Sequence, residues 1–195
     1  TELLRQCAHP GGAAICGAML WYPDETIQHA GIVTGLGGYA GHSHKYKKKG
    51  GSGYLFRTST VQDFSGVTGA CLLVKTAVYD EMHGLDEQFA VAFNDVDFCL
   101  RVRDAGYRIA WTPYAELIHY ESKSRGGDEK DPVKAARFAA EQQRLYTIHG
   151  KENILDDPYY NPNLTRDRED FSESGDLRRL KEGRVTVRFR GGTLQ

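Results

Sequence analysis

The chain has 195 residues, of which 40% are hydrophobic and 26% charged, and its formal net charge is -1 at pH 7. A chain of this length and composition can form one domain with a sizeable core. The near-zero charge argues against a nucleic-acid-binding protein, whose binding surface would be strongly basic. No run approaches the roughly 18 apolar residues that a membrane span needs, and the first residues do not resemble a signal peptide.

The cysteines are four in number and show no Cys-x-x-Cys spacing: Cys7, Cys16, Cys71 and Cys99. We expect reduced, mostly buried thiols rather than disulfides, which favours a reducing compartment. Because the chain starts at Thr1 rather than at a methionine, we expect it to be part of a longer polypeptide.

The first part of the chain alternates short apolar runs with glycine. Residues 13–22 predict a strand that ends before Pro23, and residues 27–33 predict a second one. Eight glycines lie between Gly31 and Gly53, together with His42 and His44. Because so many glycines disfavour regular structure, we expect a long mobile, solvated loop there.

The middle of the chain alternates strand-like and helix-like patterns. The predicted strands are 69–74, which we expect to be buried on both faces, 107–111, which stops before Pro113, and 117–119. The predicted helices are 75–82, 95–105 and 132–148, the last with Asp131 as its N-cap. This alternation predicts an α/β fold. Beyond Gly150 the composition becomes polar, so residues 151–195 are expected to form a polar C-terminal tail, draped or disordered, after a domain of residues 1–150.

Two acids, Asp95 and Asp97, stand at the predicted start of the second helix. A structural role would explain one of them, because a negative charge in a first helical turn is favoured by about 0.3–1 kcal/mol. A structural role does not account as well for two acids that occur together with Asn94 and are flanked by phenylalanines. A carboxylate at a helix start has a fixed direction and suits a general base. The residues alone leave both interpretations open.

Several motifs occur in order: Gly69-Ala70-Cys71-Leu72-Leu73-Val74, Gly84-Leu85-Asp86-Glu87-Gln88-Phe89, Asn94-Asp95-Val96-Asp97-Phe98-Cys99-Leu100-Arg101, Ala105-Gly106-Tyr107 and His119. Together they resemble the second half of a family 2 glycosyltransferase, over about residues 12–126. The resemblance implies a partial GT-A fold, the nucleotide-diphospho-sugar transferase fold, with a mixed sheet and flanking helices. It implies an inverting enzyme of the hexosyl-transfer type, of which residues 1–150 would be the C-terminal half of the catalytic domain. The N-terminal nucleotide-binding half would lie outside this chain, and the isolated segment would be inactive.

The resemblance also implies roles for single residues. The family places an acidic pair, usually Glu-Asp, at this helix start and uses it as the base. Here Asn94-Asp95 replaces that pair, so the role of catalytic base falls on Asp95 alone. Asp97 becomes a supporting or helix-start acid, and Gly69, Ala70 and Asn94 would bind the substrate or acceptor.

His119, Lys123 and Arg125 would, by the same resemblance, lie near the donor diphosphate, with His119 also a candidate metal ligand. A lone histidine is more often structural, and this alternative stays open. The implied cofactor is a divalent cation, Mg²⁺ or Mn²⁺, held mainly by residues outside this chain. The family's Asp-x-Asp metal motif ends a strand of the missing half, so Asp95-Val96-Asp97 has its form but not its position.

The implied partners are a nucleotide-diphosphate sugar donor and a saccharide or lipid-linked acceptor. The implied setting is surface polysaccharide synthesis in the cytoplasm, at the inner face of the membrane, with peripheral association of the parent protein. Two other functions stay open. One is a non-catalytic module of the same fold that binds a glycan or protein partner. The other is a metal-dependent phosphoesterase with Asp95, Asp97 and His119 as ligands.

Overall fold

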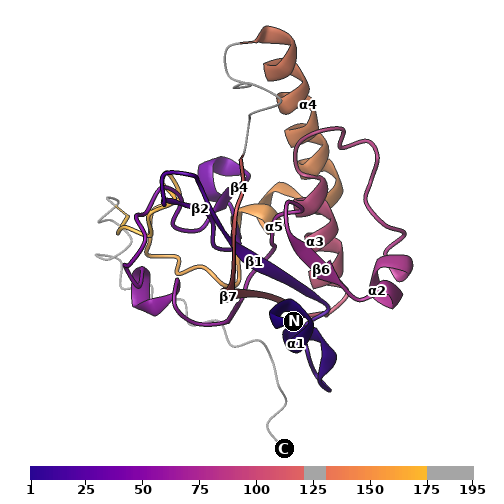
Figure 1. Cartoon of the computed structure of the whole chain (residues 1–195). Helices are drawn as coiled ribbons and strands as arrows, with labels where there is room; N and C mark the ends of the chain where they lie inside the picture. The colour runs from indigo at the N-terminus through magenta and orange to yellow at the C-terminus, as the bar shows by residue number, and fades with distance from the viewer. Residues whose placement is uncertain (121–130, 175–195) are drawn as a thin grey trace, which may run out of the picture.

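A computed structural model describes residues 1–120 and 131–174 (Figure 1). Strands and helices form a mixed α/β structure around a curled five-stranded sheet, which confirms the predicted α/β class. The strands of this sheet are β1 (Ile15–Trp21), β2 (Ile27–His29), β5 (Gln62–Asp63), β6 (Leu72–Val74) and β7 (Ile109–Ile118). Their order is β2-β1-β7-β5, with β6 also paired to β1; β1 and β7 run parallel, and the other pairs are antiparallel.

Helices cover both faces of the sheet. They are α1 (Glu2–Ala8), α2 (Thr76–Glu81), α3 (Asn94–Asp104), α4 (Pro132–His149) and α5 (Lys151–Leu155). Alternate residues of a strand point to opposite faces. Accordingly Ile15 and Ile109 join the central core with Phe98 of α3, whereas Cys16 and Ala110 pack with Cys7 of α1. This double cover explains why all seven residues of β1 are buried and why the run reads as continuously apolar.

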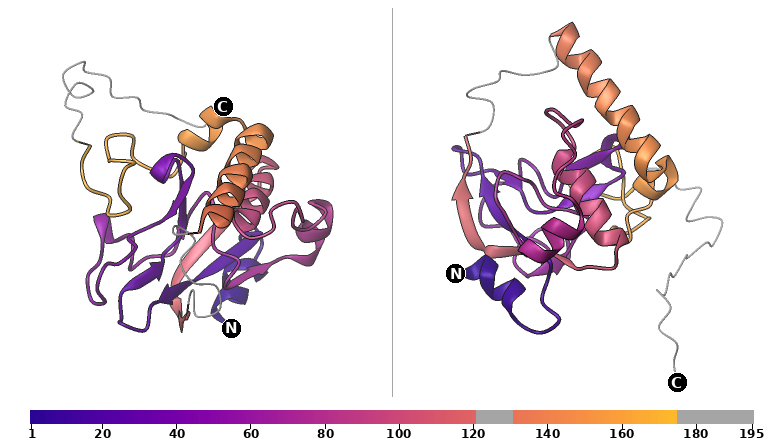
Figure 2. Two further views of the ribbon diagram at one scale, coloured as in Figure 1. Left: turned by 90° about the horizontal axis from the view of Figure 1, so that it is seen from above. Right: turned by 90° about the vertical axis from the view of Figure 1, so that its right-hand side faces the viewer.

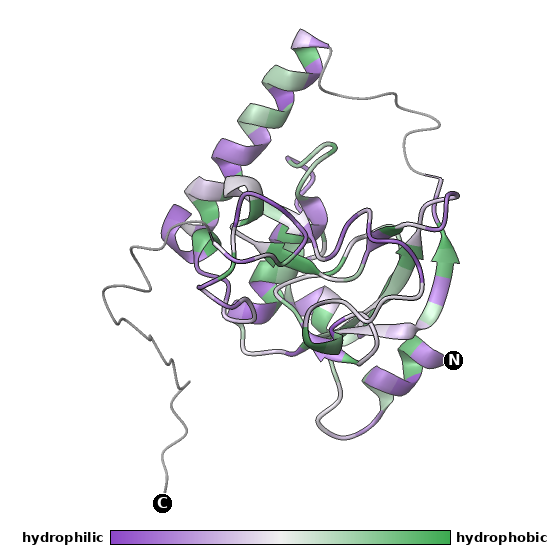
Figure 3. Cartoon of the chain, turned by 90° about the vertical axis from the view of Figure 1, so that its left-hand side faces the viewer, coloured by the Kyte–Doolittle hydropathy of each residue, from purple (hydrophilic) through white to green (hydrophobic). Residues whose placement is uncertain are grey.

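Helices α3 and α4 lie side by side, and α4 extends beyond the rest of the domain (Figures 1 and 2). The central strands are mostly hydrophobic, whereas α4 mixes hydrophobic and hydrophilic residues along its length (Figure 3). In the part of the chain that is described, no helix is both long and apolar enough to cross a membrane.

The predicted helices are confirmed to within two residues at each end. The Asp131 carboxylate accepts a hydrogen bond from the Val133 N–H, and α4 ends at Gly150, which has a φ of 77°. The free thiols are also confirmed, with Cys71 half-buried and the other three cysteines buried.

Two strand predictions were wrong in detail. Strand β6 is shorter than residues 69–74 and only half-buried, because it borders the sheet beside β1. Strand β7 does not stop before Pro113 but continues to Ile118. Its register against β1 shifts between Ala18 and Met19, whose partners are Thr112 and Glu116, so Pro113 lies in a bulge where no ladder hydrogen bond is needed.

The glycine-rich segment is not a mobile, solvated loop. It contains β3 (Ile32–Thr34) paired with β4 (Ala40–His42), and the short 3-10 helix η1 (Leu36–Gly38). The His44 side chain is 2% exposed and stacks on Phe171 with 4.2 Å between ring centroids. Gly31 is needed for its backbone conformation and its lack of a side chain, not for flexibility. Its φ is 98°, and a Cβ on it would lie 2.6 Å from the Phe64 ring.

The segment after Gly150 is not disordered through residue 174. Tyr160, Leu164 and Phe171 join the same core cluster as β1, and the buried Asp157 accepts a 2.7 Å hydrogen bond from the Thr34 N–H. The segment has few apolar residues, but those it has insert into the core. Residues 175–195 lie outside the described residues.

Candidate functional site

The start of α3 is held in an unusual backbone conformation. Phe93, the residue before the helix, has a φ of 64°, in the left-handed region that non-glycine residues rarely adopt. Its ring is 8% exposed and packs against Tyr39 and Phe138, at centroid distances of 5.5 and 5.1 Å. Such strain costs on the order of 1–3 kcal/mol and persists only where the surrounding structure enforces it. The aromatic cluster therefore fixes the direction in which the chain enters Asn94 and Asp95.

A buried acid of α4 holds the residues just before Phe93. The Glu141 carboxylate accepts hydrogen bonds from the Ala92 N–H at 2.7 Å and from the Val91 N–H at 3.3 Å. These two hydrogen bonds connect the loop before α3 to helix α4. Sequence reasoning missed Glu141, because its partners are 49 and 50 residues away.

Asp95 is oriented by backbone donors and stays partly open to solvent. Its Oδ2 accepts from the Gly69 N–H at 2.9 Å, and its Oδ1 accepts from the Val96 N–H at 2.9 Å. The Asp95 N–H donates in turn to Asn94 Oδ1 at 2.7 Å. Gly69 and Ala70, beside it, are exposed. Each carboxylate oxygen keeps a lone pair, and no ion pair to Asp95 occurs within residues 1–120 and 131–174, so the group can accept a proton.

The loop that carries Gly69 is itself anchored. The Cys99 Sγ accepts from the Val67 N–H at 3.5 Å, and the ring of His29 accepts from the Thr68 N–H at 3.3 Å through Nε2. Burial, followed by the neighbouring His42, holds the pKa of His29 well below its usual value. A neutral ring whose Nε2 accepts must carry its proton on Nδ1, which therefore donates to His42 Nδ1 at 2.8 Å.

Asp97 differs from Asp95 in its surroundings. It is 1% exposed, and its Oδ2 accepts from Arg101 Nη2 at 2.8 Å while its Oδ1 accepts from His149 Nε2 at 2.8 Å. Burial raises the pKa of Asp97, but the hydrogen bonds from His149 and Arg101 outweigh it and lower the pKa overall. Both oxygens are thus engaged in tying α3 to the end of α4.

The hydrogen bonds of His119 go to residues other than Asp95. His119 Nδ1 lies 2.9 Å from Gln28 Oε1, and its N–H donates to the Trp21 carbonyl at 3.0 Å. Lys123 and Arg125 fall outside the described residues.

The His, Cys, Asp and Glu side chains of the described residues do not form a binding site for a divalent cation. Among the described residues, no three His, Cys, Asp or Glu side chains are grouped so that they could hold a metal ion. Both oxygens of Asp97 accept hydrogen bonds, from Arg101 and His149, whereas the His119 ring contacts Gln28. The ligand trio that a phosphoesterase would need is therefore not assembled.

Several proteins from bacteria are similar to this chain in sequence, over different lengths. It is 46% identical over 172 residues to the uncharacterized protein y4gI of Sinorhizobium fredii (strain NBRC 101917 / NGR234), covering 88% of this chain and 19% of that protein. It is 34% identical over 165 residues to the O-antigen biosynthesis protein RfbC of Myxococcus xanthus, covering 84% of this chain and 12% of that protein. Over 80 residues it is 32% identical to the N-acetylglucosaminyl-diphospho-decaprenol L-rhamnosyltransferase of Mycobacterium tuberculosis, covering 41% of this chain and 24% of that protein.

The chain thus spans less than a quarter of the length of these relatives. No family model matches the sequence, and no solved structure matches it significantly. The names of the second and third relatives support a glycosyltransferase family for this chain. Membership of family 2 and the GT-A fold stay predictions.

Proposed function

We propose that this chain is the acceptor-side part of an inverting family 2 glycosyltransferase that acts in O-antigen or cell-wall polysaccharide synthesis. The observation that carries the proposal is the Asp95 carboxylate, oriented by the Gly69 N–H yet open to solvent and unpaired with any described cation. Two relatives, an O-antigen biosynthesis protein and a rhamnosyltransferase, support the substrate class. The nucleotide-binding half of the GT-A fold would be supplied by sequence outside this chain.

In this proposal Asp95 takes the proton of an acceptor hydroxyl as its oxygen attacks the anomeric carbon of the donor sugar. A bond from that oxygen to the anomeric carbon forms, and the bond from the carbon to the diphosphate oxygen breaks on the opposite face, which inverts the configuration. General base catalysis contributes about 10²–10⁴-fold, so positioning must supply much of the rest. Gly69 and Ala70 lack bulky side chains and leave room for the acceptor, to which Asn94 would donate through its amide.

The donor would be a nucleotide-diphosphate sugar, and His119, Lys123 and Arg125 would offset charge on the leaving diphosphate. The described residues form no cation site, so Mg²⁺ or Mn²⁺ enters the proposal only through ligands outside them, and no step is assigned to it. The relative named for a diphospho-decaprenol substrate supports a lipid-linked acceptor. Such an acceptor would bring the protein to the inner face of the membrane as a peripheral protein.

The test is Asp95→Asn in the full-length protein. Turnover should fall by about 100-fold or more, while the donor Kd stays within about twofold, because the substitution removes the base and keeps one of the two acceptor oxygens for the backbone N–H groups. Asp80→Asn, an exposed acid of α2, is the matched control and should leave turnover unchanged. Full activity of Asp95→Asn would exclude Asp95 as the base. A wild-type protein that binds glycan without any transfer would favour the non-catalytic module.

A further inference from the structure

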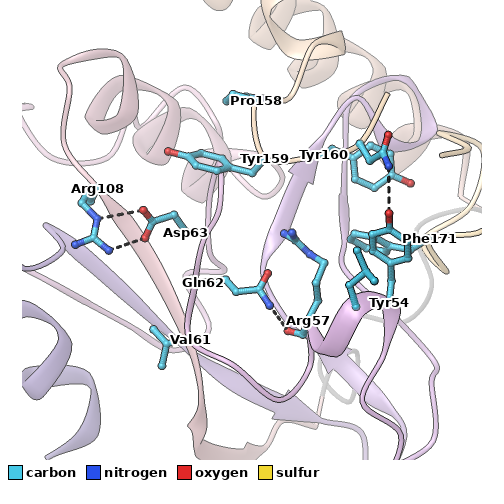
Figure 4. Close-up of a pocket in the computed structure, with 12 residues that line it drawn as sticks. Tyr54, Arg57, Val61, Gln62, Asp63, Arg108, Pro158, Tyr159, Tyr160 and Phe171 are labelled. Atoms are coloured by element: carbon cyan, nitrogen blue, oxygen red, sulfur yellow. Dashed lines mark hydrogen bonds and ion pairs between the residues drawn. The ribbon is translucent and has the colours of Figure 1, made fainter. Parts of the chain in front are cut away.

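A hollow with both polar and apolar lining lies at the β5 edge of the sheet, and Asp95 is not among its lining residues (Figure 4). Its volume is about 770 Å³, within the range of about 300–1,000 Å³ that is usual for small-molecule sites. The 3-10 helix η2 (Tyr54–Phe56) and strand β5 form one wall, and residues 158–161 form the other. The lining residues are Tyr54, Leu55, Arg57, Val61, Gln62, Asp63, Arg108, Pro158, Tyr159, Tyr160, Asn161 and Phe171.

Arg57 is the unusual residue of this hollow. Its guanidinium carbon lies 4.8 Å from the centroid of the Phe64 ring and 5.5 Å from that of Phe171. Its Nε and Nη2 are buried and donate to no group of residues 1–120 and 131–174. A buried donor without an acceptor costs about 1–3 kcal/mol, and more when it is charged. Arg57 nevertheless lines the hollow and is only half-buried as a residue (Figure 4), so a bound oxyanion would contact the part of the side chain that stays open rather than the covered Nε and Nη2.

The carboxylates near the hollow compensate Arg57 only in part: the charge of the buried Asp157 raises the pKa of Arg57, but burial has the larger effect and lowers it overall. Asp63 is engaged by Arg108, with Asp63 Oδ1 3.0 Å from Arg108 Nη2 and Oδ2 3.1 Å from Nε. The lining therefore holds two arginines and one aspartate, a net charge of +1. This surplus, which the buried Asp157 offsets in part, favours an anionic ligand over a neutral one.

Tyrosine rings supply the other part of the site. Tyr159 lies across the hollow from Arg57, and the Tyr54 hydroxyl is held by the Asn161 amide at 3.1 Å (Figure 4). A tyrosine presents an apolar ring face together with a polar hydroxyl. Such a surface suits a pyranose, whose C–H groups pack on the ring while its hydroxyls bond to polar groups such as Gln62 and Asn161.

We propose that this hollow binds a saccharide unit that carries one oxyanion, the carboxylate of a uronic acid or a phosphate, with Arg57 as its anion contact. The site is separate from Asp95 and would hold the polysaccharide at a distance from the point of transfer. The choice of a saccharide as the ligand rests on the proposed function, but the test of this site measures binding and needs no transfer activity.

The experiment titrates the full-length protein by calorimetry or ligand-observed NMR with glucuronate, glucose 6-phosphate, glucose and inorganic phosphate. Glucuronate or glucose 6-phosphate should bind at least tenfold more tightly than glucose, and the better of the two identifies the oxyanion. Arg57→Met keeps the aliphatic stem between the two rings and should abolish that preference. Arg5→Gln, an exposed arginine of α1, should not change it.

Tyr159→Ala gives an independent readout should Arg57→Met fail to fold. It should weaken sugar binding several-fold and leave the affinity for inorganic phosphate unchanged. Equal binding of glucose and both anionic sugars, or inorganic phosphate binding as tightly as glucose 6-phosphate, would overturn the proposal. Asp95→Asn should bind these probes as the wild type does, so failure of the proposed catalysis and failure of this site are distinguishable.

Discussion

The Asp95 carboxylate and the Gly69 N–H are joined by a 2.9 Å hydrogen bond across 26 residues of sequence. The bond aims the carboxylate from the start of α3 toward an exposed loop, and it does so without neutralising the negative charge. The proposed catalytic role depends on this relationship, and so does the first prediction.

Gly69→Ala should narrow the approach to Asp95 without disturbing the fold. The added Cβ would lie 3.6 Å from Asp95 Cβ and 3.8 Å from Oδ2, which are ordinary van der Waals distances. We expect the free energy of unfolding to change by less than about 0.5 kcal/mol, while the acceptor KM rises several-fold. Gly51→Ala, where the new methyl meets only the flexible end of Lys47, is the control for both measurements. An unchanged acceptor KM would show that substrate does not pass Gly69.

Asp97→Asn should destabilise the protein strongly. Removal of one partner from a buried ion pair costs about 3–5 kcal/mol, because Arg101 loses its counter-charge and asparagine keeps an acceptor oxygen for only one of Arg101 and His149. Urea unfolding at pH 7 measures this loss, with Asp80→Asn as the control.

The same pair has a defined pH dependence. Because the folded-state pKa of Asp97 is lowered, its stabilisation is present above the usual carboxyl value of 3.8 and is lost as the pH falls through the folded pKa. The stability difference between wild type and Asp97→Asn should therefore shrink below about pH 4. A difference that stays constant down to pH 2 would mean that Asp97 acts through packing alone.

His44 should make the fold sensitive to mild acid. Burial, then Arg57 and Lys47, lowers the pKa of His44 to about 4 from 6.5. A group with a lowered histidine pKa favours the folded state above pH 6.5, and this advantage is lost as the pH falls from 6.5 toward 4. The shift corresponds to a loss of roughly 3 kcal/mol, to which the buried His29 adds in the same direction.

The measurement is the slope of the free energy of unfolding against pH between 6.5 and 4. His44→Gln should flatten this slope, whereas substitution of the exposed His83 should not. A wild-type stability that is constant over this interval would contradict the buried, neutral state of His44.

Glu141→Ala should reduce activity from a distance. It leaves the Val91 and Ala92 N–H groups without their acceptor, which costs about 1–3 kcal/mol. Because those residues lead into Phe93 and Asp95, we also expect kcat to fall more than the acceptor KM changes. Glu141→Gln keeps one acceptor oxygen and should retain most of the activity; equal losses in both variants would argue for a role of the charge instead.

Local sequence signals predicted several elements because those elements are stabilised locally. The cap at Asp131 and the stop at Gly150 bound α4 correctly, and the apolar run of residues 13–22 indicated strand β1. Burial on both faces, however, was predicted for residues 69–74 and is found in β1 instead. The glycine-rich segment misled because glycine count does not distinguish backbone freedom from the left-handed turns that Gly31 and its neighbours make.

The sequence by itself determined the α/β class, the helix that starts at Asn94 and the presence of two acids in its first turn. Only the tertiary structure distinguished the two acids. It buries Asp97 against His149, 52 residues away, and leaves Asp95 half-open beside Gly69. It likewise brings Phe171 and Tyr159 to Arg57. Caps and periodicity act within a few residues, whereas the burial and the partners of a charge depend on elements that meet only when the chain has folded.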